Sequence, residues 1–337
     1  MTKKNYLEFI SKSKKPFIIY KTNKGFDLYT NFSKKIILTN KNINTFINKI
    51  TKNKKRNKST DLFIGFFGYE ILNINKKAYN KIFTKFKKKI KSGKTYQIKI
   101  CTKYKKRSKI DPIDFFCRLS QTNLAPEAFL IKDKNFSIIS CSPENLITKK
   151  GNYISTKPIA GTLKKTKKLN KTKALNFFNK NIKESKEHNM IVDMERSDLS
   201  KICQVGSVKI IKKKIIEEYK DLYHYVSLIS GKLKKNISSL KIIKAMMPGG
   251  SVIGCPKIST LNLLNAQEKE RRNIYTGSFG YIKFNGDMRF NIIIRAILNY
   301  KYFSEISVAS GVVIDSNSNH EFNENYIKAK ALMDLYK

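Results

Sequence analysis

The sequence of 337 residues has no apolar run approaching the roughly 20 residues that a membrane-spanning helix needs. Its N-terminal segment, MTKKNYLEFISKSKKPF, also lacks the apolar core of a secretory signal peptide. The five cysteines form no CxxC pair, and their odd number and wide spacing argue against a framework of disulfide bonds. These absences predict a soluble protein of the reducing cytoplasm with no membrane partner.

Acidic residues are scarce, with 25 Asp and Glu against 69 Lys and Arg, which gives a formal net charge of +44. Such a charge ordinarily suggests nucleic acid or an anionic membrane as the partner. The lysines, however, are spread with asparagine and isoleucine along the whole chain, which is typical of codon bias. We therefore expect no nucleic acid partner. The alternative, a basic nucleic-acid-binding protein, requires a contiguous basic groove with aromatic platforms.

Arginine is rare among the basic residues, with only eight in the chain. A retained arginine is informative where a planar, bidentate fork is needed. Arg196, Arg271, Arg272 and Arg295 all fall in the later half of the chain. For each of these arginines, the alternative is that it was retained by chance and has no special role.

Motifs of several common enzyme chemistries are missing. GxxxxGK[ST] is absent and no GxGxxG follows a predicted strand, which disfavours a nucleotide cofactor. The three histidines form no HExxH pair, and no GxSxG elbow occurs. His224 is kept as a catalytic candidate, although an isolated histidine in an apolar run, here DLYHYVSLIS, is more often a core residue.

The hydrophobic pattern predicts a protein rich in strands, with helices between them. We expect an α+β fold with helices around a large antiparallel sheet system, a β-sandwich. Residues 1–92 carry short, weak strand signals, and stronger signals begin at residue 93. Strands are predicted at 17–20, 35–38, 95–103, 136–142, 290–298 and 306–314, and helices at 171–191 and 320–336. Residues 62–69 form a stretch rich in glycine and aromatic residues.

The last predicted helix presents two carboxylates and an ammonium on one face. Glu321, Glu324 and Lys328 are spaced i, i+3 and i+7. This spacing is usually a solvated face, but the preceding apolar strand, which ends in a polar turn, delivers these residues to a sheet end. Glu187, late in the earlier helix, supplies a further carboxylate. Two glutamates from separate helices, with substrate oxygens and waters, suit Mg²⁺.

A second constellation is the loop MPGGSVIGCPK, which contains three glycines and two prolines and ends at Lys257. Glycines let backbone N–H groups approach an anionic ligand closely, and Lys257 adds a positive charge. The alternative is an ordinary tight connection between two elements.

Read in order, ten segments resemble the chorismate-binding enzymes, a family that includes anthranilate, aminodeoxychorismate, isochorismate and salicylate synthases. The resemblance runs from about residue 93 to the end, and GFFGYE near residue 65 is similar to an upstream marker. It implies a shortened N-terminal segment at 1–92, a catalytic region at 93–337, dependence on Mg²⁺, and chorismate as substrate. The segments are YQIKICTK, CSPENL, KPIAGT, KEHNMIVDMERSDLSKICQVGSVKI, YHYVSLISG, MPGGSVIGCPK, YTGSFGYI, FNIIIRAI, ASGVVIDS and EFNENYIKAKAL.

The resemblance also implies roles for individual residues. Glu187 of KEHNMIVD and Glu324 of EFNEN resemble the Mg²⁺ ligands, with Glu321 nearby. Glu144 of SPEN resembles the general acid beside the departing C4 hydroxyl. The implied substrate-binding residues are Tyr275, Arg295, Gly311, Lys328, Thr162 and Lys257.

Gln97 and Ala160 separate the branches of the family. Water-adding members have a lysine base where this sequence has Gln97, and an amide cannot deprotonate water. An ammonia-using branch is therefore implied, with a separate glutamine amidotransferase as partner. The loop PGGSVIGCPK, GSVKI, RRN before GSFGY, and FNIIIRA favour aminodeoxychorismate synthase. Anthranilate synthase is the alternative, because Ala160 of PIAGT replaces a lysine thought to attack the ring, unless a neighbour such as Lys157 substitutes.

Overall fold

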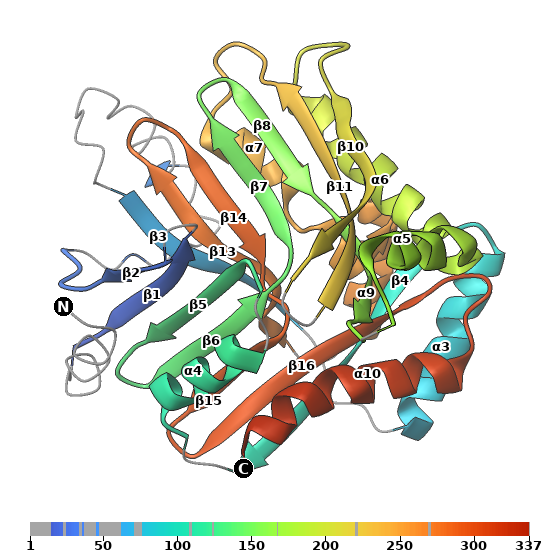
Figure 1. The fold of residues 1–337 in the computed structure, drawn as a ribbon, viewed down its shortest axis with the longest axis horizontal. Helices are drawn as coiled ribbons and strands as arrows, with labels where there is room; N and C mark the ends of the chain where they lie inside the picture. The colour runs from blue at the N-terminus through green and yellow to red at the C-terminus, as the bar shows by residue number, and fades with distance from the viewer. Residues whose placement is uncertain are drawn as a thin grey trace.

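Two large antiparallel sheets form the framework of the protein (Figure 1). The computed structural model describes residues 15–22, 25–33, 36, 45–46, 62–70, 76–107, 110–122, 125–166, 168–219, 222–268 and 271–336. Every pairing between named strands in these ranges is antiparallel. The α+β antiparallel sandwich predicted from the sequence is confirmed.

The first sheet runs in the order β12-β4-β16-β15-β6-β5-β1-β2. The second runs β10-β11-β8-β7-β14-β13-β3, and β9 pairs with β11 beside this path. The strands of the first sheet are β12 (Gly254–Cys255), β4 (Gln97–Arg107), β16 (Phe303–Val312), β15 (Ala296–Tyr300), β6 (Phe136–Ser142), β5 (Glu127–Lys132), β1 (Phe17–Thr22) and β2 (Gly25–Tyr29). Those of the second are β10 (Lys209–Glu218), β11 (Leu222–Lys232), β8 (Tyr153–Lys157), β7 (Asn145–Lys150), β14 (Met288–Ile292), β13 (Arg271–Lys283), β3 (Leu62–Glu70) and β9 (Ile159–Lys164).

Helices cover the outer faces of both sheets. On the first sheet, α4 packs against β5 and β6, and α10 runs beside β16 along the lower edge of Figure 1. On the second sheet, α6 lies against β11 and α7. No helix of the described residues is long and apolar enough to span a membrane. The helices are α3 (Lys76–Lys91), α4 (Pro112–Thr122), α5 (Lys171–Lys180), α6 (Ile182–Ile202), α7 (Ser239–Met246), α8 (Gly250–Ile253), α9 (Lys257–Gln267), α10 (Ser318–Met333) and a 3-10 turn, η1 (Asp334–Tyr336).

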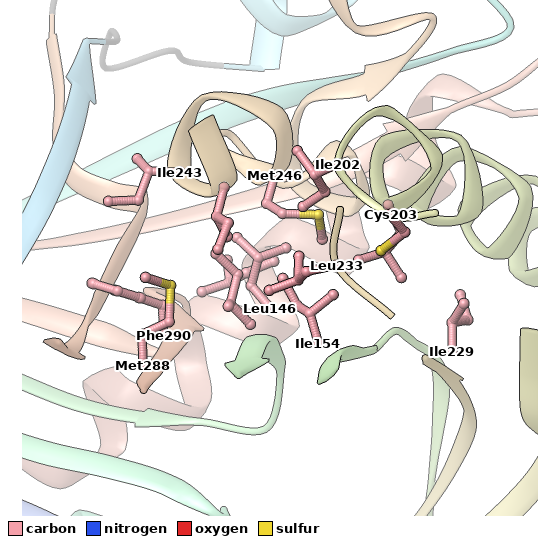
Figure 2. Close-up of a cluster of buried hydrophobic side chains, with 14 of the residues drawn as sticks. Leu146, Ile154, Ile202, Cys203, Ile229, Leu233, Ile243, Met246, Met288 and Phe290 are labelled. Atoms are coloured by element: carbon pink, nitrogen blue, oxygen red, sulfur yellow. The ribbon is translucent and has the colours of Figure 1, made fainter. Parts of the chain in front are cut away.

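Strand alternation explains how the layers are held together. Successive residues of a strand point to opposite faces, and in β6 Ile138 joins the cluster between the two sheets while Ile139 joins the cluster under α4 and α10. Between the sheets, the rings of Phe129 and Phe279 stack with centroids 3.9 Å apart. A third cluster fills the space between the second sheet and helices α6 and α7, where Leu146, Ile202 and Met246 meet (Figure 2). The first sheet is therefore buried on both faces at β6, which accounts for the continuous burial of this strand from Ser137 to Ser142.

The prediction of a single strand at 290–298 is wrong in one respect. The segment forms two strands, β14 and β15, which belong to different sheets. Residues 293–295 cross between the sheets, and Arg295 adopts a φ of 50° at the crossing. Hydrophobic periodicity cannot distinguish one long buried strand from two short ones, because both give a mostly apolar segment.

The helix predicted at 171–191 is also two elements. Asn181 ends α5 and begins α6, and its side chain accepts a hydrogen bond from the backbone N–H of Glu184. Asparagine is a favoured N-cap, so a new helix begins here at little cost. Glu187 therefore lies in the second turn of a 21-residue helix rather than late in an earlier one.

The N-terminal residues contribute to both sheets. Strands β1 and β2 extend the first sheet through the pairing of β1 with β5, and β3 pairs with β13 in the second. Helix α3 packs against β4 and α10. The strand predicted at 35–38 lies outside the described residues except for residue 36.

Candidate active site

Two side chains at the start of β4 donate hydrogen bonds to one carboxylate of helix α6. Gln97 Nε2 donates to Glu187 Oε1 over 2.6 Å, and Lys99 Nζ donates to the same oxygen over 2.9 Å. Gln97 and Lys99 approach together because alternate residues of a strand share a face. The side chains of Lys99 and Glu187 are only 13% and 16% exposed. This pair is therefore an ion pair largely removed from water.

Gly311 makes room for this cluster. It pairs with Lys99 across the β16–β4 ladder. A Cβ at this position would lie 2.6 Å from Lys99 Nζ, 2.8 Å from Gln97 Nε2 and 3.2 Å from Glu187 Oε1. Glycine is thus required by the close approach of three polar groups, since its φ is not in the left-handed region.

Helix α10 places its carboxylates at the same end of β16. Glu321 is 1% exposed and accepts a hydrogen bond from Ser316 Oγ over 2.8 Å. Glu324 pairs with Lys328 at 2.6 Å, and Lys328 Nζ also donates to the carbonyl of Ala309 over 3.0 Å. The predicted face of α10 is therefore half buried, with Glu321 inside and the Glu324–Lys328 pair at the rim.

The charges of these groups are coupled. Burial opposes the charged form of Lys99, yet the carboxylates of Glu187, Glu324 and Glu321 hold its pKa above the usual value. Burial likewise opposes ionisation of Glu187, but the Lys99 ammonium and the Gln97 amide hold its pKa below the usual value. Glu187 is consequently a carboxylate at neutral pH.

The donor set fits a magnesium ion that is completed by other ligands. No group of three or more His, Cys, Asp or Glu side chains within the described ranges lies close enough to hold a metal alone. Glu187 and Glu324 nevertheless come from separate helices and both act on the charge of Lys99. A position that accommodates one cation between hard carboxylates suits Mg²⁺, which usually keeps waters and substrate oxygens in its shell.

Glu144 occupies the junction between β6 and β7, and its side chain is only 4% exposed. Burial raises its pKa to about 7, while the Ser251 hydroxyl and the charge of Lys99 act in the opposite direction. A carboxyl group with a pKa near 7 carries a proton for part of the time at neutral pH. Such a group can donate a proton near neutral pH, which is compatible with the role of general acid that the resemblance implies.

Arg295 and His224 are both buried and influence one another electrostatically. Arg295 lies on the crossing between β14 and β15, where burial lowers the pKa of its guanidinium. Burial, and then the charge of Arg295, lowers the pKa of His224 to about 4. His224 is 2% exposed, and its ring packs edge-on against Tyr219 at 5.2 Å. His224 is therefore a neutral imidazole at physiological pH.

Tyr275 is buried beside Cys101. Burial, with Cys101 next in importance, raises the pKa of its phenol well above the usual value. The pairing of β13 with β3 shifts register between Asn273 and Ser278, and Thr276 has a φ of 62°. The irregular backbone of β13 therefore includes Tyr275.

Lys257 lies with protein partners at the start of α9. Its ammonium pairs with Asp198 and donates to the carbonyls of Ala245 and Met246 over 3.3 and 3.1 Å. An ammonium has three donors, so these contacts match its capacity. In this structure Lys257 ties the glycine-rich loop to α6 and α7.

The KPIAGT segment forms β9 and the residues before it. The side chains of Ala160 and Thr162 lie outside what the structure describes, while the backbone of Thr162 pairs with His224. Gly161 has a φ of 84°, and a Cβ there would lie 2.4 Å from the Phe178 ring. Lys157 donates to both oxygens of Glu217, over 2.9 and 2.8 Å. It is therefore already engaged in an ion pair.

Lys99 was not predicted as a site residue, and Arg272 was noted only because arginine is rare in this chain. Lys99 was one lysine among many, and its only signal was the period-two spacing from Gln97. Arg272 is 3% exposed and donates to the carbonyls of Val252 and Lys99 and to Glu268. It joins the glycine-rich loop to β4, as the rarity of arginine hinted. Arg196, in contrast, is exposed and pairs with Asp193.

The two-sheet fold is shared with solved structures that have little sequence in common with this chain. A menaquinone-specific isochorismate synthase from Escherichia coli gives a TM-score of 0.81 at 14% identity, covering 98% of this chain and 91% of that one. Anthranilate synthase component I from Streptococcus pneumoniae gives 0.71 at 24% identity, covering 91% and 69%. These likenesses establish the fold.

The sequence comparisons establish the family. The profile of the chorismate binding enzymes matches residues 16–334. Aminodeoxychorismate synthase component 1 of Bacillus subtilis is 36% identical over 256 residues, 76% of this chain and 54% of that protein. An anthranilate synthase component 1 of Haloarcula marismortui is 33% identical over 249 residues, 74% and 51%. The chain belongs to the chorismate binding enzyme family, and it spans about half the length of these curated relatives.

Proposed function

We propose that the chain is component I of an aminodeoxychorismate synthase, which forms 4-amino-4-deoxychorismate from chorismate and ammonia in the cytoplasm. A glutamine amidotransferase subunit is the proposed source of ammonia, and Mg²⁺ the proposed cofactor. The observation that carries the proposal is the buried Glu144, whose pKa of about 7 suits protonation of a leaving hydroxyl. The relative from Bacillus subtilis, 36% identical, supports the choice of product.

Substrate binding is assigned to charged groups around the cluster at Glu187. Glu187 and Glu324, with Glu321 nearby, would hold Mg²⁺, which supplies positive charge for the ring carboxylate when bound. Arg295 would bind a carboxylate through two parallel hydrogen bonds, because its fork matches that geometry. Tyr275, Gly311, Lys328 and Thr162 are the other residues proposed to contact the substrate.

Glu144 supplies the proton that the leaving hydroxyl needs in the proposed reaction. Its protonated carboxyl donates a proton to the C4 hydroxyl oxygen of chorismate, the C4–O bond breaks, and water leaves. Ammonia forms the new C–N bond and loses one proton, which returns a proton to the site. Gln97 takes no part as a base, because an amide does not accept the proton of water at neutral pH.

Anthranilate synthase is the second candidate. Ala160 at the lysine position of related folate-pathway enzymes favours it, as does the relative from Haloarcula marismortui, 33% identical. Lys157 is a poor substitute nucleophile because its ammonium is held by Glu217. Direct attack by ammonia is consequently the route proposed for either product.

The consumption of chorismate by the purified chain, with Mg²⁺ and ammonium, tests the proposal. The unchanged chain should consume chorismate, and Glu144→Gln should lower kcat by about 10²- to 10⁴-fold. Chorismate should still raise the Tm of that variant, because the amide side chain keeps the shape of the site. Full activity in Glu144→Gln would contradict the assignment. Tight, salt-sensitive binding of single-stranded nucleic acid without chorismate turnover would favour the nucleic-acid-binding alternative.

A further inference from the structure

Three buried polar atoms, one of them on Glu144 itself, have no hydrogen-bond partner among the described residues. They are Glu144 Oε1, Glu195 Oε1 and Ser251 Oγ. Their residues are 4%, 2% and 6% exposed. Buried polar groups are nearly always paired, so three such atoms in one region indicate a function other than stability.

The fold brings these residues together from three elements. Glu195 lies on α6, and its Oε2 accepts a hydrogen bond from Thr156 Oγ1 of β8 over 2.6 Å. Strand β8 pairs with β7, whose first residue, Asn145, directly follows Glu144. Ser251 is held against α6 because a Cβ on its neighbour Gly250 would lie 1.9 Å from Met194, the residue before Glu195.

The electrostatics match this geometry. Burial, and then the charge of Glu144, raises the pKa of Glu195 well above the usual value. The Thr156 hydrogen bond and the charge of Lys257 act against that rise, and Asp198 adds to it. Lys99 and Ser251 are the groups that act on Glu144. Two carboxyl groups in so little water do not both ionise readily, and they titrate as a pair.

We propose that Glu195 is a positioning residue for catalysis, and that it shares one proton with Glu144 through the region of the Ser251 hydroxyl. The inference rests on the proposed role of Glu144 as the acid. Two neighbouring buried carboxylates do not both ionise readily, so Glu195 keeps the shared proton available to Glu144 at a pH where an isolated Glu144 would lose it. When Glu144 gives this proton to the leaving oxygen, both carboxyl groups are left ionised. The proton released when ammonia forms the C–N bond then restores the starting state.

The pH profile of Glu195→Gln tests the proposal. An amide in place of the Glu195 carboxyl cannot hold a proton for Glu144. Burial, the Ser251 hydroxyl and the charge of Lys99 set a pKa of about 7 for Glu144 without any contribution from Glu195, so the variant should lose its acid above that pH. One pH unit above a pKa, about one tenth of a group stays protonated. The ratio of kcat/KM between variant and unchanged chain should therefore be near its maximum at pH 6 and about tenfold lower at pH 8. The ionisation of ammonium affects both proteins equally at each pH, so it does not change this ratio.

Infrared spectroscopy of the carboxylic acid C=O band separates this inference from the proposed function, because it needs no turnover. The unchanged chain should keep a protonated carboxyl band above pH 7, and Glu195→Gln should lose it. Glu268→Gln is the matched control, since burial also raises the pKa of Glu268 to about 7 but its partner is Arg272. That control should leave the high-pH band of the pair in place.

A flat activity ratio from pH 6 to pH 8, or a uniform loss at all pH values, would overturn the shared proton even if chorismate is consumed. An unchanged high-pH band in Glu195→Gln would overturn it as well. Glu195→Asp retains a titratable group and should recover part of the activity at pH 8. If Glu195→Gln does not fold, Glu195→Asp and Ser251→Ala carry the same test, and the second should steepen the loss at pH 8.

Discussion

Replacing Lys99 by methionine should show whether the Lys99 ammonium and Mg²⁺ occupy the same position beside Glu187. The Lys99–Glu187 pair is 13% and 16% exposed, so its loss strands a mostly buried carboxylate. Breaking a buried ion pair in this way costs about 3 kcal/mol. With an unfolding entropy of about 2.1 cal/mol/K per residue, 337 residues give ~0.7 kcal/mol/K, and Tm should fall by about 4 °C.

Magnesium should reverse this loss, because it can take the place of the ammonium beside Glu187. Thermal unfolding is measured with and without Mg²⁺, and Mg²⁺ should raise the Tm of Lys99→Met by several degrees more than that of the unchanged chain. Lys105→Met is the matched control on the same strand. Its partner Glu305 lies 3.6 Å away and its side chain is 46% exposed, so the change should cost less than ~1 kcal/mol. Equal Mg²⁺ shifts in all three proteins would refute the reasoning.

Three further outcomes are expected. Glu187→Gln should abolish chorismate turnover while leaving far-UV circular dichroism unchanged, and undiminished activity would rule out its role at the metal. Gly311→Ala should lower kcat/KM at least tenfold, because its Cβ would come 2.6 Å from Lys99 Nζ, and steady-state kinetics on the folded variant measures this. The pKa of His224 is lowered to about 4, so the unfolded chain binds the extra proton below about pH 6.5 and stability falls as pH falls. Urea unfolding should show about 2 kcal/mol less loss between pH 7 and pH 5 in His224→Gln, and equal losses would contradict the buried neutral imidazole.

The sequence predicted those features whose physical signal is local. The strand at 136–142 matches β6, and the helix at 320–336 corresponds to α10 followed by η1. These elements are decided by alternation or helical spacing within about ten residues, so a single sequence contains enough information.

Features that depend on partners distant in the sequence could not be predicted in the same way. The crossing at Arg295 depends on which sheet each half of an apolar segment joins, and Asn181 is one of many asparagines. Lys99 gained its meaning only when β4 met α6. Glu195 lies in VDMERSD, where no local pattern marks it, and its burial beside Thr156 depends on the meeting of α6 with β8.

The identity of the product tests the central claim most directly. The purified chain would be incubated with chorismate, Mg²⁺ and ammonium, and the product analysed by mass and fluorescence. A product that retains the enolpyruvyl group, with the C4 hydroxyl replaced by an amine, is the predicted result. Fluorescent anthranilate with released pyruvate would contradict it and would make Ala160 the decisive residue.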